Sequence, residues 1–131
     1  MTGETNLERM LSSLDVERRA GTYTFVVGSH AELDGDALAV VEEIEGRTLV
    51  VPVDAARRAG LDVEFEAAWL TLTVHSSLEA VGLTAAFSRV LADAGIPCNV
   101  LAGYHHDHLL VPVDRADDAI DVLRALGSGR S

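Results

Sequence analysis

Apolar residues recur along this chain with two different periods, which predict strands and helices in alternation. Around residues 69–74, apolar side chains alternate with threonine, the two-residue period of a strand that has one wetter face. Around residues 83–94, the apolar positions follow the i, i+3, i+4, i+7 spacing of one helical stripe. Gly95 and Pro97 then end that helix. The chain is therefore expected to be of the α+β class.

The same patterns assign an element to most of the chain. The first half is expected to hold strands at 22–28, 37–45 and 47–53, a short helix at 54–59 and a strand at 62–66. The second half is expected to hold a strand at 68–75, a helix at 83–94, strands at 98–105 and 108–113, and a helix at 115–126. Ahead of both, Thr5 and Glu8 form a capping box for a helix whose apolar stripe is Leu7, Met10, Leu11 and Leu14. This order predicts antiparallel sheets with helices on one face.

A block of six residues occurs twice. Leu49–Asp54 (LVVPVD) returns as Leu109–Asp114 (LLVPVD), and such a repeat marks a duplicated supersecondary unit. We therefore expect two units, residues 1–66 and residues 67–131. Where the second unit has its first helix, the first unit has only the short polar loop 30–36. The first unit is thus predicted to be shortened, with the N-terminal helix in the place of the missing one.

The acidic composition excludes several classes of partner. A formal net charge of −11 over 131 residues argues against nucleic acid or an anionic membrane as a partner. No apolar stretch approaches the ~20 residues that a membrane-spanning helix needs. Cys98 is the only cysteine, which excludes an intrachain disulfide and a cysteine metal cluster and favours a reducing, cytoplasmic location. We expect Cys98 to be a small buried apolar residue, and Trp69 and Phe87 to lie in the core.

The loop between the strand and the first helix of the second half carries most of the candidate chemistry. A helix start presents unpaired backbone N–H groups and the positive end of the helix dipole, which suits a small anion. The hydroxyls of Ser76, Ser77 and Thr84 either donate to a ligand carboxylate or only cap the helix. Gly82 either lets a ligand approach the backbone or makes the turn. Glu79 either pairs with a ligand ammonium or interacts with the helix dipole.

Histidines gather at the last predicted hairpin. His105, His106 and His108 flank Asp107, and imidazole is a common zinc ligand. Side chains alternate along a strand, so His106 and His108 can share a face that His105 cannot join. Two ligands do not complete a metal site, so the favoured interpretation is a turn in which Asp107 takes left-handed geometry. The nucleophile-elbow pattern does not occur in the sequence, and no catalytic residue is assigned.

Three blocks of the second half resemble the ACT-domain family: residues 75–86 (HSSLEAVGLTAA), 95–103 (GIPCNVLAG) and 106–112 (HDHLLVP). They are similar above all to small tandem ACT-like proteins and to the regulatory ACT domains of aspartate kinase. The resemblance implies two ferredoxin-like units of the βαββαβ type, the first of them shortened. It also implies a regulatory module that binds amino acids or similar small molecules at an interface between two such domains.

The resemblance also maps a ligand site onto this sequence. The family uses the loop from the first strand to the first helix and the residues that open the next strand. Those positions are Ser76, Ser77, Leu78, Glu79, Ala80, Val81, Gly82, Leu83, Asn99 and Val100. Asn99 is expected to face the loop, where its amide holds the ligand in one orientation or only satisfies neighbouring backbone.

The sequence therefore predicts a cytoplasmic, non-enzymatic protein that binds an amino-acid-type ligand, needs no cofactor or metal, and forms a homodimer. Its signal would pass to a separate regulated protein that the sequence does not identify. Two alternatives stay open. One is a ligand-free dimerisation module, and the other is a metal-dependent enzyme that uses the His105–His108 cluster.

Overall fold

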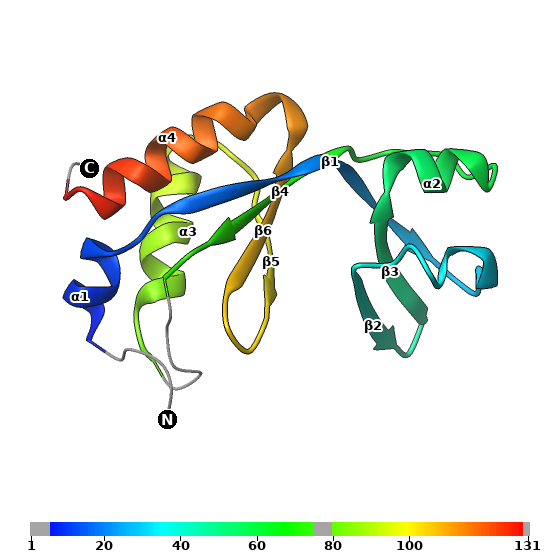
Figure 1. The fold of residues 1–131 in the computed structure, drawn as a ribbon, viewed down its shortest axis with the longest axis horizontal. Coiled ribbons are helices and arrows are strands. Elements are labelled where there is room, and N and C mark those ends of the chain that lie inside the picture. Colours follow the sequence, from blue (N-terminus) through cyan, green and yellow to red (C-terminus); the bar gives the residue numbers. More distant parts are fainter. Residues whose placement is uncertain (1–5, 75–79, 130–131) are drawn as a thin grey trace. The chain divides into compact units, whose positions relative to one another are not determined.

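A computed structural model of the chain describes residues 6–74 and 80–129 (Figure 1). The chain packs into two compact units. Unit 1 combines Met1–Arg19 with Ala68–Ser131, and unit 2 is Ala20–Ala67. The predicted α+β class with antiparallel sheets is confirmed.

The helices and strands are assigned to the units as follows. Unit 1 holds α1 (Leu7–Ser12), the start of β1 (Val16–Val27), β4 (Ala67–Leu72), α3 (Leu83–Asp93), β5 (Asn99–Ala102), β6 (Asp107–Pro112), the 3-10 turn η2 (Val113–Arg115) and α4 (Ala116–Gly127). Unit 2 holds the rest of β1, the 3-10 turn η1 (Ala31–Leu33), β2 (Ala39–Glu43), β3 (Gly46–Pro52) and α2 (Val53–Arg58). The predicted boundary between residues 66 and 67 divides the chain by its sequence repeat, whereas the two units are defined by packing. That boundary therefore stays a prediction about the duplicated segments.

The sheet of unit 1 takes one strand from the start of the chain. Its strand order is β1–β4–β6–β5, so the start of β1 lies beside β4. The Thr73 N–H donates to the Asp15 carbonyl at 3.0 Å, and the Arg19 guanidinium lies 5.6 Å from the centre of the Trp69 ring. Residue numbers thus fall along β4 as they rise along β1, which is an antiparallel register. The three strands of the β4–α3–β5–β6–α4 segment thus gain a fourth strand from the N-terminal part of the chain.

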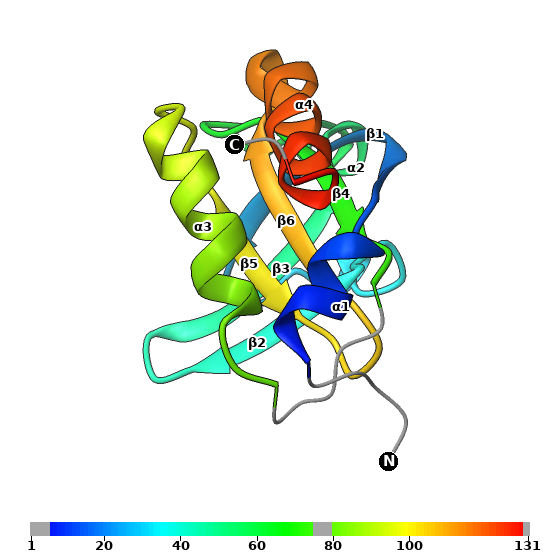
Figure 2. The same cartoon turned by 90° about the vertical axis from the view of Figure 1, so that its left-hand side faces the viewer.

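Helices α1, α3 and α4 cover one face of the unit 1 sheet, as Figure 2 shows. The core between them and the strands is built from fully buried apolar side chains, among them Met10, Leu70, Leu72, Phe87, Leu91, Leu109, Val111 and Leu123. Phe87 is fully buried in this core, as expected. Trp69 is also buried, with 4% exposed, but it lies on the opposite face of the sheet from Leu70 and Leu72. The apolar stripes read from the sequence therefore face the sheet, and their burial is the main stabilising term of this unit.

Helix α1 differs from its prediction in its cap and in its position. The Asn6 side chain accepts from the Arg9 N–H at 3.0 Å, so Asn6 is the N-cap and the predicted box with Glu8 is wrong. Thr5 lies outside the described residues. The helix packs against α3 and α4 of unit 1. The expectation that it fills the place of the missing helix in the first half is therefore also wrong.

Unit 2 closes its small core with one leucine from η1. Its strand order is β2–β3–β1, with Val40 opposite Leu49 and Phe25 opposite Val50. Leu33 is 2% exposed and packs in a cluster with Val26, Leu49, Val51, Ala55 and Ala56. A single turn thus supplies the apolar contact that a full helix supplies in unit 1.

Two further local predictions are wrong. Residues 61–66, all of them described, hold no strand. Their apolar alternation serves packing, since Phe65 stacks on Phe25 with ring centres 6.2 Å apart. Asp107 is an ordinary first residue of β6, and no described non-glycine residue has a positive φ. The turn before β6 is closed instead by the Gly103 N–H, which donates to the His106 carbonyl at 2.9 Å.

Candidate functional site

The start of α3 is shaped by Gly82. This glycine is the N-cap with φ +102°, a left-handed conformation that other residues adopt at a cost, and no side chain caps the helix there. A Cβ at Gly82 would lie 3.0 Å from Leu7 Cδ2. Substitution of Gly82 by valine would therefore strain the fold itself, so the loop cannot be tested with that variant.

The first turn of α3 offers backbone N–H groups of the kind that bind small anions. The first four N–H groups of a helix have no partner within the helix, and the helix dipole places partial positive charge beside them. No acidic residue occupies the first turn, and Thr84 is exposed there. Leu83 is 4% exposed, so its side chain belongs to the core and only its backbone can serve a ligand. The described part of this arrangement can hold a carboxylate on backbone N–H groups.

The structure describes only part of the predicted loop. Residues 76–79, which include both serines and Glu79, lie outside the described residues. Ala80 is half-buried and packs on the unit 1 core, whereas Val81 is 82% exposed. The described end of the loop therefore presents backbone and one exposed apolar side chain beside the helix start.

Asn99 does not lie beside the start of α3 within unit 1. Helix α3 carries the chain from Leu83 back along the sheet, and β5 begins at Asn99 just after the far end of the helix (Figure 1). Eleven helical residues span about 16 Å, too far for one amino acid to reach. Within this unit Asn99 therefore does not face the described end of the loop, residues 80–82.

Asn99 and Val100 also point to opposite faces of the sheet. Asn99 is paired with Leu110, and Val100 with Leu109, whose side chain lies in the helix-covered core. Successive strand residues alternate between faces, so Asn99 is on the face that the helices leave uncovered. The two side chains cannot contact one ligand together from a single copy of the chain.

A polar cluster around His108, which the sequence did not reveal, occupies that same face. The Trp69 indole N–H donates to His108 Nδ1 at 3.3 Å, and Thr71 Oγ1 lies 2.9 Å from the same nitrogen. An imidazole nitrogen that accepts carries no proton, so His108 is neutral with its proton on Nε2. Burial lowers the pKa of His108, and His106 and Arg19 lower it further against the opposing effect of Asp107.

The other candidate groups have ordinary surroundings. Among the described residues, no group of three or more histidine, cysteine or acidic side chains is placed to hold a metal ion. The His105 ring meets Tyr104 edge-on at 5.0 Å. Cys98 packs on the unit 1 core, and burial raises the pKa of its thiol to about 11. A protonated thiol is a poor nucleophile and a poor metal ligand, in keeping with an apolar role.

Comparison with known proteins gives family matches over residues 2–125. Residues 2–68 match one family model of the ACT domain and residues 64–125 match another. A Vibrio cholerae protein of unknown function, described as a possible transport protein, is 43% identical with a TM-score of 0.82, over 92% of this chain and 95% of that one. No functionally curated protein matches in sequence. Within the described residues, no helix is both long and apolar enough to cross a membrane.

Two more distant structures share the fold. An Agrobacterium tumefaciens protein is 17% identical with a TM-score of 0.64, over 87% of this chain and 89% of that one. The ligand-free regulatory subunit of aspartate kinase from Thermus thermophilus is 12% identical with a TM-score of 0.63, over 85% of this chain and 95% of that one. At these identities the likeness concerns the arrangement of strands and helices.

Acidification is expected to weaken the fold through His108. Its folded pKa lies below the ordinary value of 6.5, so the unfolded chain takes up the proton first. The stability that neutral His108 contributes is present above about pH 6.5 and is lost as the pH falls through the folded pKa. Between about pH 7.5 and 5, urea unfolding should therefore show a larger loss of stability in the native protein than in His108→Gln, whose amide does not titrate.

Trp69 offers a second readout, because it is the only tryptophan. Its fluorescence should change with a midpoint below about pH 6.5, since a protonated Nδ1 no longer accepts from the indole. The change should be absent in His108→Gln. An equal loss of stability in that variant, or a midpoint above the ordinary histidine value, would contradict the neutral assignment.

Proposed function

This chain belongs to the ACT-domain family, and we propose that it is a non-catalytic regulatory protein whose amino-acid-type ligand binds between two copies of the chain. ACT domains are typically regulatory modules that bind ligands. The observation that carries the proposal is the start of α3, where a left-handed glycine and an exposed first turn without acidic residues leave backbone N–H groups open to a carboxylate.

In this proposal the ligand carboxylate sits on the first-turn amides of α3, with Thr84 at its side. The loop positions Ser76, Ser77, Leu78, Glu79, Ala80, Val81 and Gly82 would surround the rest of the ligand, with Glu79 available for an ammonium group. The backbone of Leu83 would contribute its N–H, because its side chain belongs to the core.

A second copy of the chain would supply Asn99. One helix length separates Asn99 from the loop within a copy, so a site that uses both must combine two copies. In a dimer with two-fold symmetry, each copy gives its α3 start to one site and its Asn99 to the other. Ligand binding and association would then strengthen each other by the same factor, which is the linkage that regulation requires.

A ligand-free dimerisation module is the second candidate function. It is favoured by β2, the edge strand of unit 2, where Val40 is 49% and Val41 46% exposed, and by Ile44 beside it, which is fully exposed. Exposed apolar edge strands pair readily with other chains. In this case the protein would dimerise whether or not an amino acid is present.

A thermal-shift screen against the twenty amino acids tests the ligand site. A ligand at 100 times its Kd should stabilise the protein by about 2.7 kcal/mol. Thr84→Glu should abolish that gain, because a carboxylate in the first turn repels the ligand carboxylate while it stabilises the helix start itself. Ser29→Glu adds the same charge at an exposed position of unit 2 and should bind like the native protein. A screen without any stabilising amino acid would favour the ligand-free module.

Mixing two defective variants tests whether the site is shared between copies. Asn99→Ala removes the amide from an exposed position, so neither this variant nor Thr84→Glu should bind the ligand alone. An equimolar mixture should regain binding, because a mixed dimer contains one site with an intact α3 start and an intact Asn99. Isothermal titration calorimetry should then find about one site per mixed dimer. Full binding by Asn99→Ala alone, or no recovery from defective variants that do form mixed dimers, would contradict a shared site.

A further inference from the structure

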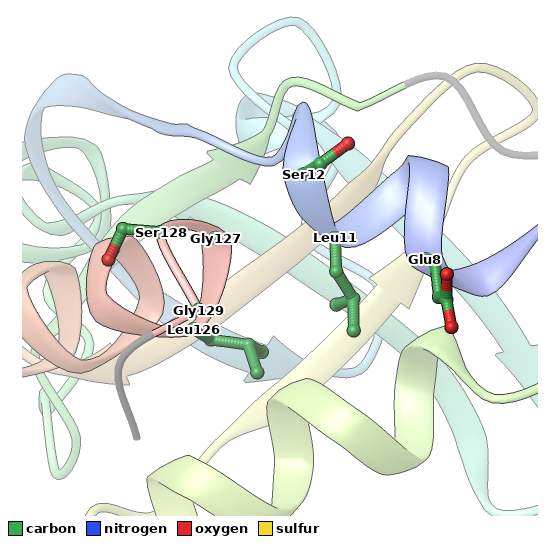
Figure 3. A pocket seen from close by; sticks show the side chains of 7 residues that line it. All are labelled: Glu8, Leu11, Ser12, Leu126, Gly127, Ser128 and Gly129. Carbon is green, nitrogen blue, oxygen red and sulfur yellow. The ribbon is translucent and has the colours of Figure 1, made fainter.

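A cavity lies within unit 1 between α1 and the end of α4. It has a volume of about 380 Å³ and is lined by Glu8, Leu11 and Ser12 of α1 and by residues 126–129 at the end of α4. Figure 3 shows the side chains of Leu11 and Leu126 facing each other across the space, with Glu8 on the other side of Leu11 in this view. This volume falls at the small end of the range for ligand pockets.

The end of α4 that borders the cavity is held firmly in place. The Arg124 Nε–H donates to Asp15 Oδ1 at 2.9 Å, and a second guanidinium nitrogen donates to the Val16 carbonyl at 3.3 Å. A Cβ on Gly127 would lie 2.5 Å from the Leu14 carbonyl oxygen, so the helix end lies directly against the segment that leaves α1. The cavity wall is therefore preformed, which lowers the entropic cost of binding.

The charges that the described lining residues bring to the cavity are of one sign. Glu8 contributes a carboxylate, and the C-terminal end of α4 contributes the negative end of a helix dipole. Arg124, the basic residue of the last turn, is engaged with Asp15. The hydroxyls of Ser12 and Ser128 donate to backbone carbonyls within their own helices, so they are not directed to an anion.

We infer that this cavity binds a small primary amine in its ammonium form, with the hydrocarbon part between Leu11 and Leu126 and the ammonium on Glu8. A primary ammonium fits better than a quaternary one, because its N–H groups can donate to the carboxylate. None of the described lining residues is aromatic, so they form no cage of the kind that recognises quaternary ammonium groups. The net charge of −11 would also attract a cationic ligand.

Titration with n-hexylammonium chloride, followed by the amide shifts of a ¹⁵N-labelled sample, tests this inference. The amides of Gly127, Ser128 and Gly129 should shift together and saturate. Hexanoate should not shift them, and 1-hexanol should bind more weakly, because neither offers a cation to Glu8. The probe has no carboxylate, so the outcome is independent of the amino-acid site at α3.

Three variants separate the ionic from the apolar contribution. Glu8→Gln should weaken hexylammonium binding roughly twofold to fivefold, as expected for an exposed ion pair, and should leave 1-hexanol binding unchanged. Glu45→Gln removes the same charge from an exposed position of unit 2 and should have no effect. Leu126→Ala should weaken both probes alike. No saturable shift up to the solubility limit, or equal binding of hexanoate, would overturn the assignment.

Discussion

The pairing of Val16–Arg19 with β4 is the interaction on which unit 1 depends. The segment from β4 to α4 supplies three strands, and the start of the chain supplies the fourth. Helix α1 directly precedes that strand, so the pairing also places α1 against α3 and α4. Leu7 thereby reaches Gly82, and Leu11 comes to face Leu126. Both candidate ligand sites thus rest on a contact between residues that are far apart in the sequence.

The position of α3 determines how an amino-acid site can be built. A helix that joins two strands of one sheet carries the chain back to the end where the first strand began. The α3 start and Asn99 are consequently kept apart by the length of the helix. The rigidity of one unit then makes a second copy necessary for any ligand that uses both groups. Such a ligand would act as a link between copies, and its concentration would set the degree of association.

Much of the fold could be predicted from the spacing of apolar residues along the chain, because most of these residues are buried on one face of their strand or helix. The repeat located β3 and β6, and the apolar stripe located α3, whose observed end at Asp93 lies one residue from the predicted one. The first part of β1 was not predicted, because the successive charged residues Glu17, Arg18 and Arg19 show no alternation of apolar and polar positions. This segment is a strand because it pairs with β4. The position of α1 was not predicted either, because its own sequence does not indicate which helices it packs against.

The candidate site was predictable only in its local half. Gly82 and the first turn of α3 follow from the sequence around them, whereas the distance of Asn99 follows from the path of the chain through the sheet. The Trp69–His108 pair joins residues 39 positions apart, and only the register of β4 and β6 brings them together. The alternation that puts Trp69 and Thr71 on one face was the one signal of that cluster.

Native-state hydrogen exchange tests the central claim most directly. If the N-terminal strand is an integral part of unit 1, the Thr73 amide, which donates to Asp15, should exchange only when the whole unit opens. Its free energy of exchange should then equal that of core amides such as Leu109 and Val111. A much lower value for Thr73, with the amides of Val16–Arg19 exchanging early beside an intact β4–β6 core, would contradict the account.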